Sequence, residues 1–266
     1  MPITGTPMKH LAFILTLFLS NLIPNTVSAA DLSRSEVIQL LKNASKAKPA
    51  NLRRNDLKGV DLSKLDFRNA DLWGADLRGA DLSQSNLSDL VLDLTVMTGI
   101  NLSGADLSRV SIFGVSMMRS NLSNVNFSDS RVIANLDNSN MSNANLANVR
   151  WGADMKNQPM GLMRVSLNKV NLTNANLQNA DLGRATLRFA NLTDANLSNA
   201  ILISAELGAA NFTDANVSHV DFTAAKLADS NFTNATLTGA NFHKIQGLDS
   251  ARGLKNNKTK SASMFD

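Results

Sequence analysis

Few residues in this chain could carry out acid–base or metal chemistry. The sequence has three histidines, His10, His219 and His243, and no cysteine. It contains no glycine-rich phosphate loop, no HExxH zinc helix and no GxSxG nucleophile turn. Aspartates are plentiful, but they recur at a fixed place in a five-residue pattern, so neighbouring carboxylates are expected without catalysis. We therefore expect no enzymatic activity, no cofactor and no metal site.

The five-residue pattern organises most of the chain. From Asn171 to Phe242 a large apolar residue, nearly always Leu or Phe, stands at every fifth position, and Ala usually stands two residues before it. We number the large apolar residue i. His219 then falls at i+2 and His243 at i+1, so the two histidines would not come together as a metal pair.

A period of five fits neither regular secondary structure. Five helical residues advance about 500°, so successive Leu side chains would point about 140° apart and form no stripe. In a long strand an odd repeat would send each successive Leu to the opposite face. A short extended piece followed by a turn satisfies the pattern, and Asn, Asp, Ser, Thr and Gly crowd the remaining positions. The repeat therefore predicts an all-β solenoid whose stacked coils bury a shared core.

This tandem A(N/D)LXX text resembles the pentapeptide-repeat family over roughly residues 50–245. The resemblance implies a right-handed quadrilateral β-helix with four repeats per coil, in which i and i−2 point inward while i−1, i+1 and i+2 point outward. Some relatives in that family mimic DNA and protect or inhibit topoisomerases. Fold alone does not decide between such functions.

The N-terminus has the features of a secretory signal peptide, residues 1–29. Lys9 and His10 precede the apolar run Leu11 to Leu19, and Val27-Ser28-Ala29 has the small residues of a cleavage site. The run is shorter than the roughly 20 residues that span a membrane, although an anchoring or buried segment is the alternative. We expect export to the periplasm, or to the thylakoid lumen if the source is photosynthetic, with membrane contact only through the uncleaved signal.

Residues 30–48 lack the repeat and carry apolar residues at helical spacing. Ser33 and Glu36 form a capping box, Leu32 and Val37 can form its hydrophobic staple, and Pro49 stops the helix. We expect a short N-terminal helix that caps the first coil, because an open β edge invites pairing with other chains. A helix that binds a partner is the alternative.

The repeat itself is interrupted once. It runs in one register through residues 49–132, slips by one residue in an irregular junction at 133–161, and resumes at Leu162 through residue 245. The junction contains Pro159 and Gly161, so we expect either a displaced coil with a loop or a kink. Residues 246–266 are expected to form a closing segment and a basic tail.

The charge of the repeat region argues against nucleic-acid chemistry. Residues 51–242 contain 16 Lys and Arg against 18 Asp and Glu, so the high isoelectric point comes from the ends. A DNA mimic needs a dense acidic surface. A DNA-mimic protein that protects or inhibits a topoisomerase is therefore the alternative rather than the expected function, and we expect neither nucleic acid nor a small-molecule substrate as ligand.

Outward positions with apolar side chains give the best indication of function. With four repeats per coil, positions twenty apart stack on one face, and two faces of the first half keep Asn, Asp and Ser throughout. The other two faces depart from that pattern, and a contiguous apolar patch usually marks an interaction site. Either a protein partner or a second copy covers this patch, or the chain covers it itself. We name it the apolar corner; its residues are Trp73, Val91, Leu94, Val96, Phe113, Met118 and Ile133. The sequence thus predicts a non-enzymatic, exported binding or structural scaffold.

Overall fold

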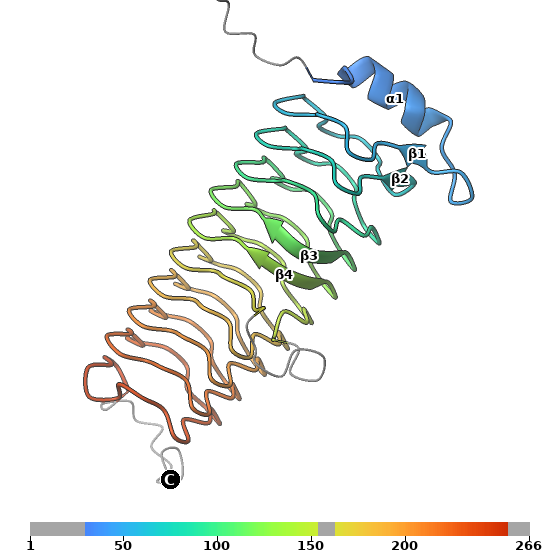
Figure 1. Ribbon diagram of the computed structural model, residues 1–266. Helices are drawn as coiled ribbons and strands as arrows, with labels where there is room; N and C mark the ends of the chain where they lie inside the picture. The colour runs from blue at the N-terminus through green and yellow to red at the C-terminus, as the bar shows by residue number, and fades with distance from the viewer. Residues whose placement is uncertain (1–29, 154–162, 255–266) are drawn as a thin grey trace, which may run out of the picture.

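The computed structural model describes residues 30–153 and 163–254. These residues form one stack of similar coils, with a helix across its N-terminal end (Figure 1). The predicted signal peptide, Pro159 and Gly161 of the junction, and the tail beyond residue 254 lie outside the described residues. Within the described part, no helix is long and apolar enough to cross a membrane.

Most repeats contain a tight turn that begins at residue i. In the repeat at Leu72, for example, the Ala75 N–H donates to the Leu72 carbonyl at 2.9 Å, and Gly74 has a φ of 69°. A positive φ at the third residue defines a type II turn. Nearly every repeat has such a left-handed residue at i+2, whether or not it is glycine. The turn predicted from the polar residues of the repeat is confirmed.

The Asn or Asp at i−1 shapes this turn. Its side-chain oxygen accepts a hydrogen bond from the backbone N–H of i+1, as Asp61 Oδ1 does from Ser63 at 2.9 Å and Asp71 Oδ1 from Trp73 at 3.1 Å. Such a bond imitates a backbone turn, and it gives the backbone N–H of i+1 an acceptor that it would otherwise lack. The repeat therefore places Asn and Asp at i−1 for a local structural reason.

Successive coils pair as parallel strands, twenty residues apart. Because each straight side is short, most pairings are single parallel bridges, such as Asp81 with Asn101. Two pairs are longer: β1 (Ala50–Asn51) with β2 (Ala70–Asp71), and β3 (Ser111–Ser116) with β4 (Arg131–Asn135). We name the four faces of the solenoid after residues of one coil: the Leu72, Leu77, Leu82 and Leu87 faces.

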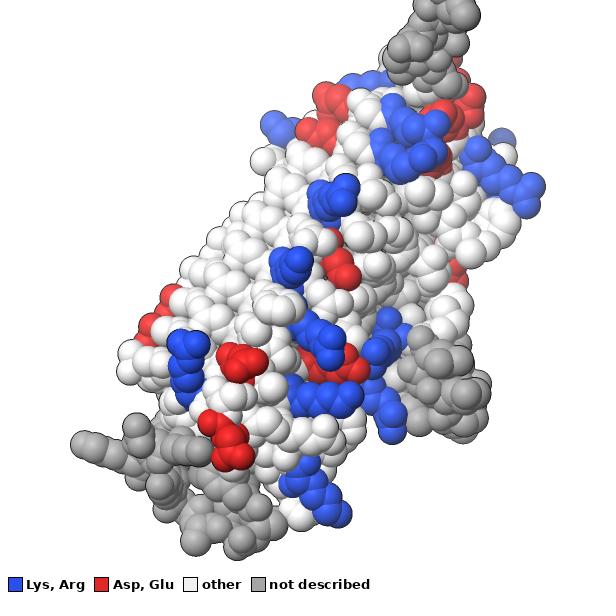
Figure 2. All heavy atoms as spheres, turned by 60° about the vertical axis from the view of Figure 1, so that its left-hand side comes forward, with Lys and Arg blue, Asp and Glu red and all other residues white. Residues whose placement is uncertain are grey.

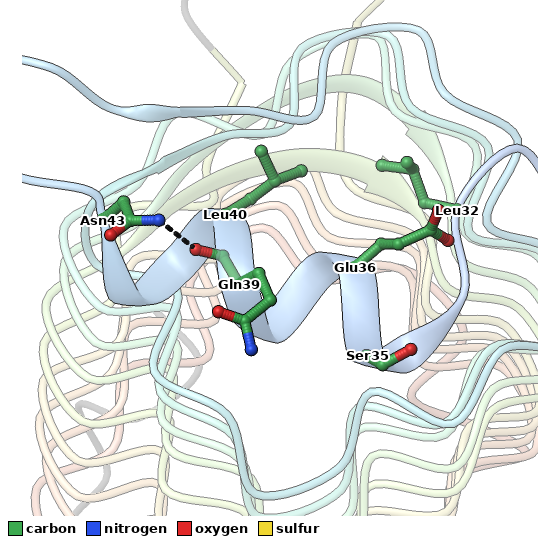
Figure 3. A pocket seen from close by; sticks show the side chains of 6 residues that line it. All are labelled: Leu32, Ser35, Glu36, Gln39, Leu40 and Asn43. Atoms are coloured by element: carbon green, nitrogen blue, oxygen red, sulfur yellow. Dashed lines mark hydrogen bonds between the residues drawn. The ribbon is translucent and has the colours of Figure 1, made fainter.

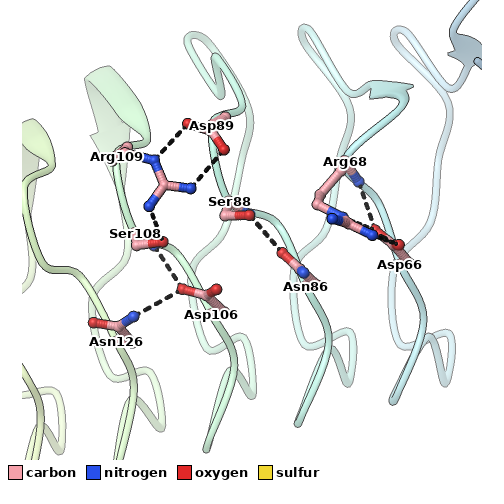
Figure 4. A network of polar contacts seen from close by, with 9 residues as sticks. All are labelled: Asp66, Arg68, Asn86, Ser88, Asp89, Asp106, Ser108, Arg109 and Asn126. Atoms are coloured by element: carbon pink, nitrogen blue, oxygen red, sulfur yellow. Dashed lines mark hydrogen bonds and ion pairs between the residues drawn. The ribbon is translucent and has the colours of Figure 1, made fainter. Parts of the chain in front are cut away.

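The Leu82 and Leu87 faces are polar throughout the first half. On the Leu87 face, Asn126 Nδ2 donates to Asp106 Oδ1 at 2.9 Å, and Arg109 makes two 2.7 Å bonds to the Asp89 carboxylate twenty residues earlier (Figure 4). Hydrogen-bonded Asn and Asp ladders of this kind add side-chain pairing to the backbone pairing of stacked strands. These two faces are fully explained as solvated structural surfaces.

The core consists of the residues at i and i−2. The large side chains at i are almost all fully buried, and the Ala side chains at i−2 in the second half are buried as well. Where a hydroxyl replaces Ala, it bonds to backbone: Ser85 Oγ donates to the Leu62 carbonyl at 2.9 Å and Ser139 Oγ to the Met117 carbonyl at 2.8 Å. The predicted inward pair of positions is confirmed.

The helix α1 (Arg34–Lys42) covers the first coil. Ser33 and Glu36 form the predicted capping box, and Val37 is fully buried. Arg34 extends the cap, because its guanidinium donates to the carbonyl oxygens of Asp61 and Ser63, each at 2.9 Å. The helix ends at Lys42, six residues before the end of the predicted segment 30–48, because Asn43 caps it and residues 45–48 form a tight turn.

The register slip is confined to β4. β3 and β4 pair with a bulge between Phe113 and Val115, so six residues of β3 face five of β4. The following repeats pair with residues 19 positions earlier and 31 positions later, as Asn140 does with Asn121 and Asn171. The described part of the junction therefore continues the stack as ordinary coils, and the additional residues enter after Trp151.

Candidate functional site

In the part of the chain that the structure describes, the two histidines lie apart. His219 lies against Gly239 of the following coil, whereas His243 lies on the Leu72 face. Within residues 30–153 and 163–254, no cluster of three His, Cys, Asp or Glu has the arrangement of a metal site.

The apolar corner lies where the Leu72 and Leu77 faces meet. Val91, Leu94 and Val96 come from one coil and are exposed to 59%, 53% and 38%. Phe113, in β3 of the following coil, is exposed to 38%, and Trp73 and Met118 are half-buried. Six of the seven predicted residues therefore reach the surface in three successive coils.

The prediction is wrong for Ile133, which is only 3% exposed. Ile133 pairs with Phe113 in the β3–β4 register, but β4 crosses the corner with one residue fewer and without a left-handed turn residue. The side chain consequently stays within the wall of the solenoid. The sequence showed a slip within residues 133–161, but it did not show that β4 loses its turn residue beside Ile133.

Leu94 is exposed because of its neighbours in the stack. It occupies the left-handed turn position, with a φ of 61°, and the equivalent positions in the adjacent coils are Gly74 and Gly114. Neither glycine has a side chain that could cover it. A large apolar residue in a strained turn, between two glycines, has no role in the core of this solenoid.

The chain covers one end of the apolar corner itself. The guanidinium carbons of Arg53 and Arg54 lie 4.7 and 4.8 Å from the centre of the Trp73 ring, and Arg53 also pairs with Asp71 at 2.9 Å. These cation–π contacts hold Trp73 in place. The part of the corner formed by Val91, Leu94, Val96 and Phe113 keeps its exposed surface.

Two further sets of exposed apolar side chains were missed in the sequence. Ile201 and Ile203 are exposed to 41% and 39% on the Leu72 face of the second half, and Phe189 is exposed to 61% on a different edge. Ile201 stands at i−1, where the repeat places Asn or Asp, so the same signal that identified the apolar corner was present.

Two shallow hollows lie outside the exposed part of the apolar corner. One, of about 440 Å³, lies along α1 and is lined by Leu32, Glu36, Gln39 and Leu40 among others (Figure 3). The other, of about 330 Å³, borders β3 and β4 and includes Ile133 and Arg164. Neither brings together groups suited to acid–base or nucleophilic chemistry.

Basic side chains of the second half gather on one side of the solenoid. Figure 2 shows Lys and Arg along the length of one face, with fewer acidic side chains among them. Between residues 163 and 244 all six Lys and Arg lie on the Leu77 face or beside its two edges; they are Arg164, Lys169, Arg184, Arg188, Lys226 and Lys244.

Glu206 is the acidic centre of this basic region. Its carboxylate lies 3.2 Å from Arg164, 3.3 Å from Arg188 and 3.6 Å from Lys226, and its side chain is 16% exposed. Burial raises the pKa of Glu206, but the charges of Arg164, Lys226 and Arg188 and the hydrogen bond from Arg164 outweigh burial and lower the pKa below its ordinary value.

Two family models match the sequence. The model of the pentapeptide repeat region matches residues 160–242, and the model of pentapeptide repeats (8 copies) matches residues 46–74, 75–112 and 100–132. Together they cover both halves of the solenoid and more than half of the chain.

Several solved structures are similar to this chain, and HetL shares its fold. HetL, a pentapeptide repeat protein involved in heterocyst differentiation regulation from the cyanobacterium Nostoc sp. strain PCC 7120, is 28% identical, with a TM-score of 0.52 over 83% of this chain and 96% of HetL. QnrB1, a plasmid-mediated fluoroquinolone resistance protein, is 17% identical over 73% of this chain and 93% of its own, with a TM-score of 0.40. No curated protein sequence matches the chain. The right-handed quadrilateral β-helix implied by the resemblance is confirmed.

Proposed function

The chain belongs to the pentapeptide repeat family, and from this premise we propose that it is an exported, non-enzymatic binding or scaffold protein that recognises a protein partner through the apolar corner. The family consists in general of structural or binding proteins. The part of the corner that carries the proposal is the exposed set Val91, Leu94, Val96 and Phe113.

One observation supports this role most strongly. On the Leu72 face the inward residues Leu72, Leu92 and Ile112 are buried to 99% or more, so the core is complete without the outward apolar side chains. Apolar area at outward positions can leave water only against another surface, at about 25 cal/mol per Å² before the costs of association. A protein partner, or a second copy of the chain, provides such a surface.

Export rests on the N-terminal sequence. A basic start, an apolar run from Leu11 to Leu19 and small residues before Ala30 are the features of a cleaved secretory signal. We propose the periplasm, or the thylakoid lumen in a photosynthetic source, as the compartment. Fractionation of the native host and the intact mass of the protein test this: the expected mature chain begins at Ala30 or Asp31, and a cytoplasmic protein that retains Met1 contradicts export.

The DNA-mimic alternative lacks a supporting observation. A mimic must present a continuous acidic surface to a basic groove. The second half instead turns its Lys and Arg to the Leu77 face, around the single carboxylate of Glu206.

Phe113→Asp tests the binding surface. Placing a charge at a 38% exposed position should abolish partner binding and leave the melting temperature nearly unchanged, because surface substitutions usually alter stability by no more than about 0.5 kcal/mol. Phe189→Asp, at an exposed aromatic outside the corner, is the matched control and should still bind. Binding is measured as recovery of partners from the exported compartment. Equal recovery with both variants, or a large fall in melting temperature for Phe113→Asp, contradicts the proposed surface.

A further inference from the structure

Asp93 stands at the centre of the apolar corner. It occupies the outward i+1 position between Trp73 in the preceding coil and Phe113 in the following coil, because positions twenty apart stack on one face. Its neighbours within the coil are Val91 and Leu94, which are more than half exposed. A single carboxylate is thus surrounded by aromatic and aliphatic side chains.

One oxygen of this carboxylate has no partner. Oδ1 of Asp93 is buried, and no described residue donates a hydrogen bond to it. Two basic residues of the first coil are engaged elsewhere, since Arg53 and Arg54 lie over the Trp73 ring and Arg53 pairs with Asp71. A buried acceptor without a donor costs free energy, and such a group in a native structure requires an explanation.

The other carboxylates of the first half illustrate how unusual this is. Asp66, Asp76 and Asp89 each bond to an arginine of the chain, Arg68, Arg78 and Arg109 respectively. Asp61, Asp71 and Asp81 each accept a backbone N–H at i+1. Asp93 stands at i+1 rather than i−1, so it is out of place for this turn bond, and Val91 at i−1 supplies no acceptor of its own.

We propose that Asp93 receives an arginine side chain from the protein partner of the apolar corner. This inference rests on the proposed function and names the chemistry that the partner must present: a guanidinium flanked by apolar side chains. The charge of Asp93 favours a cation, and a rotation of this half-buried side chain would bring the oxygen that lacks a donor within reach of a guanidinium. Arginine fits better than lysine, because its planar guanidinium can bond to a carboxylate with two N–H groups and also pack against the exposed ring of Phe113.

A small probe tests this contact without knowledge of the partner. N-acetyl-arginine-N-methylamide is titrated into the mature protein, and the backbone amide shifts of residues 73, 93 and 113 are followed by NMR. The uncharged citrulline derivative, which has nearly the same shape, is the matched probe. The arginine probe is expected to move these resonances at millimolar concentration and the citrulline probe far less. Equal shifts with both probes, or none with either, overturn the inference.

Two variants locate the acceptor. Asp93→Asn keeps the shape of the side chain and removes its charge, so it should weaken binding of the arginine probe about tenfold, the expected loss for a charge-assisted hydrogen bond. Asp214→Asn removes a carboxylate on the edge between the Leu82 and Leu87 faces and should leave binding unchanged. The same loss in both variants would show a general effect of net charge and overturn the assignment.

Thermal stability separates a recognition role from a structural one. If the carboxylate of Asp93 has no partner within the protein, Asp93→Asn should melt at the same temperature as the wild type or higher. A clear fall in melting temperature would reveal an internal partner and overturn the inference. Failure of the arginine probe while Phe113→Asp still abolishes partner recovery would overturn the role of Asp93 alone; failure of both would remove the apolar corner as a surface.

Discussion

At the scale of single residues, the left-handed position at i+2 accepts many residue types besides glycine, and most of them are strained there. Glycine adopts a positive φ without cost, and Asn and Asp tolerate it, but other residues are strained by about 1–2 kcal/mol. Phe189 holds a φ of 59° although its side chain is 61% exposed and so gains little from packing. Such a residue weakens the solenoid locally.

Phe189→Gly should therefore stabilise the protein by up to about 1 kcal/mol, since relief of the left-handed strain exceeds the added flexibility of the unfolded chain. Chemical denaturation measures the change. Phe189→Ala is the control, because Ala keeps the strain and should gain little. A loss of stability with Phe189→Gly would mean that the ring packs on the protein after all.

Glu206 gives a pH dependence with a defined sign. Its pKa in the folded protein lies below the ordinary value of 4.5, so its ionised form stabilises the fold above that pH, and this contribution is lost as the pH falls through the lowered pKa. Glu206→Gln should lower the free energy of unfolding at pH 7 by about 1 kcal/mol or less, given the partly exposed partners. Once the pH lies below the lowered pKa of Glu206, the difference from the wild type should vanish. A difference that persists undiminished at low pH would mean that the carboxylate acts through packing rather than charge.

At the scale of the repeat and its strands, aromatic rings at i extend the stacking into the core. Phe212 and Phe232 stack with centroids 4.5 Å apart and planes 6° from parallel, and Phe222 and Phe242 do the same at 4.9 Å and 8°. The twenty-residue spacing in the sequence predicts both pairs. The rings of the two pairs also meet edge to face, as Phe222 and Phe232 do at 5.7 Å.

Phe232→Ala removes a ring that touches all three others, as the Phe222 ring also does. It should destabilise the protein by about 3–5 kcal/mol, the cost of an aromatic truncation in a packed core. Equilibrium unfolding measures the loss. Phe189→Ala, at an exposed ring, serves again as the control, and a loss below about 1 kcal/mol for Phe232→Ala would show that the coil relaxes around the missing ring.

The sequence predicts these elements well where the five-residue period is intact and poorly where it fails. The period fixes which residues point inward, so the core and the Phe stacks follow from it. At Ile133 the period indicated an outward side chain. Because β4 is one residue shorter than β3, the side chain of Ile133 is instead buried. Whether Oδ1 of Asp93 has a donor depends on the residues of its own coil and of the two adjacent coils, so no local sequence pattern reveals that it lacks one.

At the scale of the whole molecule, outward residues that depart from the repeat lie along the same face of a continuous stack, so together they can form a surface. Pairing at intervals of 19 and 31 residues carries the ladder through the junction, so each face runs the length of the solenoid (Figure 1). The Leu72 face consequently bears Val91 and Phe113 of the apolar corner and, further along, the pair Ile201 and Ile203. We expect a partner that engages the corner to lie along this face.

Site-specific crosslinking in the native host tests the central claim most directly. A photoreactive phenylalanine analogue replaces Phe113 in one strain and Phe189 in another, and adducts are collected from the exported compartment. The account predicts a discrete adduct at position 113 and none at position 189. The same adducts at both positions, or none at position 113 from a protein that is folded and exported, would contradict it.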